Sequence, residues 1–134
     1  DFRKRIVAAK PVVRRTREGT ILGQAGFQHL SGIGSVEREL QFTAGCVRIT
    51  DRISGRGRQN IRRRFCTPHP VVRDGDTAVI DAGAASYRLS TGGEVSLIEI
   101  TCWAAYGQGI RGTLIVTETG GALPVDAVAT LERI

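Results

Sequence analysis

The chain has 134 residues, 41% of them hydrophobic, with a net charge of +6 and a pI near 10.0. This length suits one domain with a single core, and no apolar run approaches the ~20 residues that a membrane-spanning helix needs. The positive charge favours a polyanionic partner, namely nucleic acid, an anionic membrane or an acidic polysaccharide; the alternative is a solvated surface that aids solubility. Because the chain begins with Asp1 and contains no Met, we expect it to be a piece of a longer protein.

The first third of the chain predicts short strands separated by turns. A strand over 12–16 is followed by a turn at Glu18-Gly19 and by a second strand from Thr20. The stretch 23–34, GQAGFQHLSGIG, is expected to be a loop because glycine recurs through it.

Three strands are predicted between residues 36 and 65. Apolar and polar residues alternate over 36–42 and 46–53, which is typical of half-buried strands, and Gly45 supplies the positive φ of the hairpin between them. The stretch 54–57, SGRG, turns the chain into a basic strand over 60–65. We expect Arg63 in this strand either to extend its charge to solvent or to lie near the sheet edge. We expect the three strands to form one antiparallel meander with an apolar face and a strongly basic face.

The rest of the chain also predicts strands and turns. Residues 66–70 interrupt the sheet, turns follow at 74–76, 82–83 and 91–93, and residues 102–112 are expected to form the longest irregular loop. Turn signals every ~8–12 residues without helical periodicity predict an all-β fold, an antiparallel two-layer β-sandwich. The expected core consists of Val36, Leu40, Val47, Ile49, Ile53, Ile61, Phe65, Leu97, Leu114, Val116 and Val125.

The order of several segments resembles the C-terminal β-sandwich domain of heparinase II/III-type polysaccharide lyases. The run DRISGRGRQNIRRRF over 51–65 is similar to that family's Asp-Arg-hydrophobic-x-Gly-x-Gly turn and its basic strand ending in an aromatic residue. GGEVSL over 92–97, Tyr106-Gly107 before a strand, and GALPV over 121–125 agree in order. The resemblance covers roughly residues 3–134, so residues 1–134 are interpreted as one such domain.

The resemblance implies a function for the parent protein: β-elimination on an acidic, uronate-containing polysaccharide. That reaction needs a base, an acid and positive charge to stabilise an enolate. In the family, the base and the acid are mainly a Tyr and a His. The Tyr lies on a helical toroid and the His lies in a His-Asn-Thr segment, and both precede the β-domain. Neither matches a position here, so we expect no catalytic residue, and we interpret His29 and His69 as surface or capping residues. The helical domain of the parent protein is therefore an expected partner of this chain. The resemblance also favours a periplasmic or secreted location.

Metal and cofactor sites are not expected. Gln24-Ala25-Gly26-Phe27 stands where relatives have His-Asp-Gly-aromatic, and a Gln carbonyl is a poor zinc ligand compared with imidazole. The three cysteines, Cys46, Cys66 and Cys102, lack metal-binding spacing, so we expect small buried thiols of which at most one pair could form a disulfide.

Six residues are candidates for substrate binding: Arg48, Arg52, Arg62, Arg64, Tyr106 and Arg111. If the two basic strands are neighbours, four guanidiniums share one face and could bind sulfates or carboxylates. The alternative is a solvated face in which Arg62 and Arg64 pair with Glu37 and Glu39.

Trp103 and Tyr106 offer faces for stacking on sugars, although a single Trp in a sandwich is more often a core residue. No aromatics are interleaved with the basic strands, which disfavours nucleic acid as a partner, and no membrane partner is expected. A free-standing β-sandwich that binds glycans or other polyanions is the alternative function.

Overall fold

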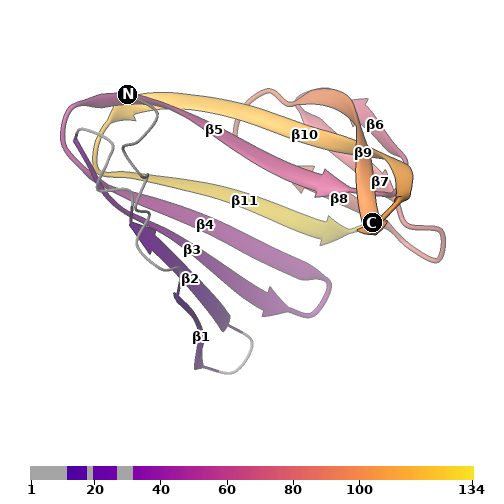
Figure 1. Cartoon of the computed structure of the whole chain (residues 1–134), viewed down its shortest axis with the longest axis horizontal. Coiled ribbons are helices and arrows are strands. Elements are labelled where there is room, and N and C mark those ends of the chain that lie inside the picture. Colours follow the sequence, from indigo (N-terminus) through magenta and orange to yellow (C-terminus); the bar gives the residue numbers. More distant parts are fainter. Residues whose placement is uncertain (1–11, 18–19, 27–31) are drawn as a thin grey trace. The chain divides into compact units, whose positions relative to one another are not determined.

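The computed structural model describes residues 12–17, 20–26 and 32–134, and these residues form strands joined by turns (Figure 1). Within these ranges no helix has the length and apolar character to cross a bilayer. The strands are β1 (Val12–Arg17), β2 (Thr20–Gly26), β3 (Ile33–Thr43), β4 (Cys46–Gly55), β5 (Arg58–Thr67), β6 (Val71–Asp74), β7 (Thr77–Asp81), β8 (Ser86–Ser90), β9 (Ser96–Ala105), β10 (Gln108–Ala122) and β11 (Val125–Arg133).

The strands form two sheets. The larger has the order β1-β2-β3-β4-β11-β8-β7-β6 and the smaller the order β5-β10-β9. This arrangement confirms the predicted all-β, antiparallel two-layer sandwich. The chain divides into two compact units, one made of the described part of 1–59 with Gly121–Val128, and the other of Asn60–Gly120 with Ala129–Ile134.

The first unit is built on the hairpin of β3 and β4, and its apolar face follows the predicted alternation. Val36 pairs with Ile53, and Leu40 pairs with Ile49. Both isoleucines are buried. Gly45 has a φ of 73° in the turn between Thr43 and Cys46, which confirms the predicted hairpin.

The same apolar face carries a charged pair that the sequence analysis did not foresee. Asp51 is only 5% exposed, and Arg38 lies directly opposite it on β3. The guanidinium donates two hydrogen bonds to the carboxylate, Nε to Oδ1 at 2.7 Å and Nη2 to Oδ2 at 2.8 Å. Mainly because Arg38 donates these hydrogen bonds to the Asp51 carboxylate, the pKa of Arg38 is raised above its ordinary value.

The second unit has its own buried apolar residues, among them Ala78, Leu89, Val95 and Ile115. Arg63 is also buried there, at 4% exposure. Its guanidinium carbon lies 5.2 Å from the centre of the Phe65 ring, within cation–π range. The expectation that Arg63 extends its charge to solvent is therefore wrong, whereas the alternative position near the sheet edge agrees with the place of β5 as an outer strand of its sheet.

The prediction of a three-strand antiparallel meander is wrong for its third strand. β4 and β5 follow each other in the chain but belong to different sheets, and β5 pairs with β10. Between them the chain bends at Gly55 and Gly57, whose φ values are 137° and 82°. Of the expected core, Ile49, Ile53 and Val116 are buried. The others are half-buried: Val36, Leu40, Val47, Ile61, Phe65, Leu97, Leu114 and Val125.

Two predicted loops are shorter than expected. β2 runs through Gly26 and β3 begins at Ile33, so residues 23–26 and 33–34 of the predicted loop are strand. Phe27 and His29 lie outside the described residues. The predicted loop over 102–112 is a hairpin, in which β9 continues to Ala105 and β10 begins at Gln108.

Candidate functional site

The β9–β10 hairpin presents two aromatic side chains to solvent. Trp103 is 68% exposed and Tyr106 is fully exposed, so the interpretation of Trp103 as a core residue is wrong. Gly107 has a φ of 73°, which allows the tight turn after Tyr106. The indole of Trp103 lies beside Gly109, where an added Cβ would be 3.0 Å from a ring carbon. Glycine on the opposite strand therefore makes room for the ring to lie against the hairpin.

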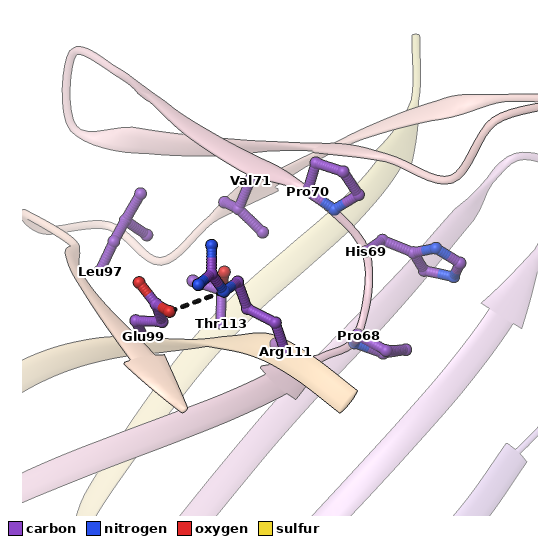
Figure 2. A pocket seen from close by; sticks show the side chains of 9 residues that line it. Pro68, His69, Pro70, Val71, Leu97, Glu99, Arg111 and Thr113 are labelled. Carbon is purple, nitrogen blue, oxygen red and sulfur yellow. Dashed lines mark ion pairs between the residues drawn. The ribbon is translucent and has the colours of Figure 1, made fainter. Parts of the chain in front are cut away.

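A pocket of about 470 Å³ lies beside this hairpin. Arg111 on β10 and Glu99 on β9 form an ion pair there, with Nε 2.8 Å from Oε1. Figure 2 shows this pair, and it shows His69 pointing away from it. Arg111 remains largely exposed, so its other N–H groups are open to a ligand. The pocket is lined by Pro68, His69, Pro70, Val71, Leu97, Glu99, Arg111, Gly112 and Thr113.

The polar face of the β3–β4 hairpin is partly neutralised. Nη1 of Arg52 lies 3.5 Å from Oε2 of Glu39 and 3.8 Å from Oε2 of Glu37. Arg48 is exposed, lies opposite Gln41, and has no ion pair with any described residue. The two glutamates thus pair with Arg52 on β4, and the alternative in which they pair with Arg62 and Arg64 is wrong.

The outer face of β5 carries a second pair of arginines. Arg62 and Arg64 are both exposed and share one face of the strand. Nε of Arg62 donates to Oε1 of Glu118 at 2.8 Å, whereas Arg64 has no ion pair within the described part of the chain. Because β4 and β5 lie in different sheets, the structure does not place the four arginines on adjacent strands, and that prediction is wrong.

Two of the three cysteines lie side by side in the smaller sheet. Sγ of Cys66 and Sγ of Cys102 are 3.6 Å apart. Their hydrogen bond raises the pKa of the Cys102 thiol. Cys66 is exposed, and Cys46 and Cys102 are half-buried, so the expectation of buried thiols is wrong. No sequence signal links Cys66 to Cys102, since only the strand order brings them together.

The described residues contain no cluster of three or more His, Cys, Asp or Glu side chains suited to a metal ion.

No family model and no curated protein matches this sequence, but solved structures do match the fold. A mutant of heparan sulfate lyase HepC from Pedobacter heparinus aligns with a TM-score of 0.67 at 13% identity, over 94% of this chain and 21% of that chain. The fold is that of a heparinase-like β-sandwich domain. A heparinase III gene product aligns with a TM-score of 0.66 at 11% identity, over 93% of this chain and 22% of that chain.

A further heparinase III structure aligns with a TM-score of 0.57 at 14% identity, over 94% of this chain and 21% of that chain. This chain therefore spans about a fifth of the length of the structures that it matches. These matches confirm the resemblance seen in the sequence at the level of the fold.

Proposed function

We propose that this chain is the β-sandwich module of a polysaccharide lyase that acts on an acidic, uronate-containing polysaccharide by β-elimination. The observation that carries the proposal is the alignment of 94% of the chain with one part of a heparan sulfate lyase structure. In this proposal residues 1–134 form one module that supports a helical domain of the same parent protein and completes its substrate cleft.

The chemistry of β-elimination supports a non-catalytic role for this module. The reaction needs a base beside the uronate and an acid at the leaving oxygen. Among the described residues His69 is the one histidine, and it points away from the Arg111–Glu99 pair (Figure 2). Because the Tyr and the His of the resembling family both precede its β-domain, we assign the base and the acid to the helical domain.

The module's contribution to substrate binding is electrostatic. We propose that a sulfated or carboxylated glycan contacts arginine side chains and one exposed aromatic ring. These residues are Arg48, Arg52, Arg62, Arg64, Tyr106 and Arg111. Glu39, Glu99 and Glu118 neutralise part of this charge. We therefore expect affinity no tighter than about micromolar, roughly 8 kcal/mol, and a steep loss of binding with added salt.

The test is retention of the chain on immobilised heparin at low salt. The double variant Arg62→Glu with Arg64→Glu should lose retention, because it reverses two charges on one face of β5. The matched control is the double variant Arg14→Glu with Arg15→Glu. Both residues are exposed on β1, and their replacement changes the net charge by the same amount as the β5 variant does. Circular dichroism checks that both variants keep the strand signal. If the β5 variant elutes with the parent chain, or if the control loses as much retention, the contact through β5 is refuted.

A free-standing glycan-binding sandwich is the second candidate, and the exposed pair Trp103 and Tyr106 favours it. Aromatic faces of this kind can stack on sugar rings without any partner domain. Replacing both by Ala should abolish glycan binding if the chain acts alone, and should leave most of the heparin retention if the β5 arginines carry it. A helical domain encoded upstream of Asp1 would favour the lyase module.

A further inference from the structure

The thiols of Cys66 and Cys102 meet across an intervening strand. Cys66 lies on β5 and Cys102 on β9, while β10 runs between these two strands. Gly112 on β10 makes the approach possible. A Cβ added at Gly112 would overlap Sγ of Cys102 and would lie 2.9 Å from the carbonyl oxygen of Thr67. The glycine thus leaves a gap in the sheet surface that the Cys102 sulfur fills.

Both thiols are free, and their sulfurs are 3.6 Å apart, the contact distance of two unbonded sulfur atoms. A single S–S bond would require the sulfurs to approach to about 2.05 Å. An atom bonded to both sulfurs would join them at their present separation.

We propose that Cys66 and Cys102 form a two-thiolate binding site for a soft, thiophilic metal ion. Thiolate sulfur is the ligand that such ions prefer. With the bonds of about 2.3 Å that zinc makes to thiolate sulfur, sulfurs 3.6 Å apart give an S–metal–S angle of about 100°. That angle is close to tetrahedral, so the sulfurs need not move. The two remaining positions go to solvent or to a small exogenous ligand.

The binding step is a proton exchange without any redox change. One divalent ion replaces the protons of both thiols, two metal–sulfur bonds form, and two protons pass to the solvent. The hydrogen bond between the thiols, which raises the pKa of Cys102, is lost in the same step. The site does not depend on the lyase proposal, because neither cysteine is among the residues proposed to contact a glycan.

The test uses the whole chain, fully reduced, with Cd²⁺ as the probe ion. Sulfur-to-cadmium charge transfer absorbs in the ultraviolet, so titration should show one ion bound per chain with the intensity of two thiolates. Cys66→Ser and Cys102→Ser should each weaken binding at least about tenfold, because one thiolate cannot chelate. Cys46→Ser is the matched control and should bind as the parent does.

A second variant tests the geometry while keeping both thiols. Gly112→Ala should displace the Cys102 sulfur and weaken Cd²⁺ binding by a similar factor, with circular dichroism reporting whether the strands persist. If Gly112→Ala misfolds, the two serine variants decide the question alone. Binding that survives Cys66→Ser, or that falls equally in Cys46→Ser, overturns the proposal.

Discussion

Arg38 is a charged side chain on the apolar face of β3, and the reason for its position is Asp51. The carboxylate of Asp51 is almost fully enclosed, and moving a charge out of water costs several kcal/mol unless an opposite charge and hydrogen bonds compensate for it. Arg38 supplies both, because its planar fork matches the two carboxylate oxygens. Its own side chain is 41% exposed, so the guanidinium remains partly hydrated.

We predict that Arg38→Met lowers the free energy of unfolding by about 2–3 kcal/mol, because Asp51 loses its guanidinium partner. Urea denaturation followed by circular dichroism measures the change. Arg48→Met is the control on the polar face and should shift stability by less than about 0.5 kcal/mol. Adding Asp51→Leu to Arg38→Met should restore part of the loss, since the enclosed charge is then gone. Equal effects of the two single variants would contradict this account.

At the scale of elements, Gly55 closes the end of the β3–β4 hairpin. Its φ is 137°, and an added Cβ would overlap the carbonyl oxygen of Gly32. The same carbonyl accepts a hydrogen bond from the backbone N–H of Arg56 at 2.8 Å. The close approach of the two backbone segments therefore requires a residue without a side chain at this point.

We predict that Gly55→Ala destabilises the chain by more than about 2 kcal/mol, because both the backbone strain and the overlap must be relieved. Gly45→Ala is the comparison: its φ of 73° is also positive, but the space around it is open. Strain alone should cost about 1 kcal/mol there. Thermal or urea unfolding of the two variants provides the measurement, and a smaller loss for Gly55→Ala than for Gly45→Ala would rule out the overlap argument.

The strands also show what the alternation of apolar and polar residues in a sequence can and cannot predict. The pattern over 36–53 predicted which side chains share a face, and Val36, Ile49 and Ile53 lie as expected. It could not predict that β5 leaves for the other sheet, because alternation is the same whichever strand is the neighbour. The β9–β10 hairpin was missed for a different reason. Trp103 and Ile110 lie on opposite faces of its tip, yet both are exposed, so no polar face marks the strands.

At the scale of the whole molecule, the chain resembles about a fifth of a heparan sulfate lyase structure. We predict that the isolated chain has no lyase activity on heparan sulfate, alginate or related uronates. The measurement is the ultraviolet absorbance of unsaturated uronate products after prolonged incubation. Turnover that disappears on His69→Ala would contradict the assignment of the base and acid to another domain.

The fold class and the family resemblance were predictable from the whole sequence because turn signals, alternation and segment order extend along all of it. The candidate sites were less predictable, since they depend on side chains brought together by strand order. Arg62 meets Glu118 through the pairing of β5 with β10. Cys66 meets Cys102 only because Gly112 leaves room between them. Neither pairing leaves a trace in the local pattern of residues.

β5 is an outer strand of its sheet. Besides the proposed contact with a glycan, its arginines therefore affect whether another chain can pair with it. Within the described residues β5 is an outer strand of the order β5-β10-β9, and no second described strand pairs with it. An outer strand can accept a further strand from another chain, which leads to aggregation. The exposed charges of Arg58, Arg62 and Arg64 oppose such an approach, because a second copy would bring the same charges against them.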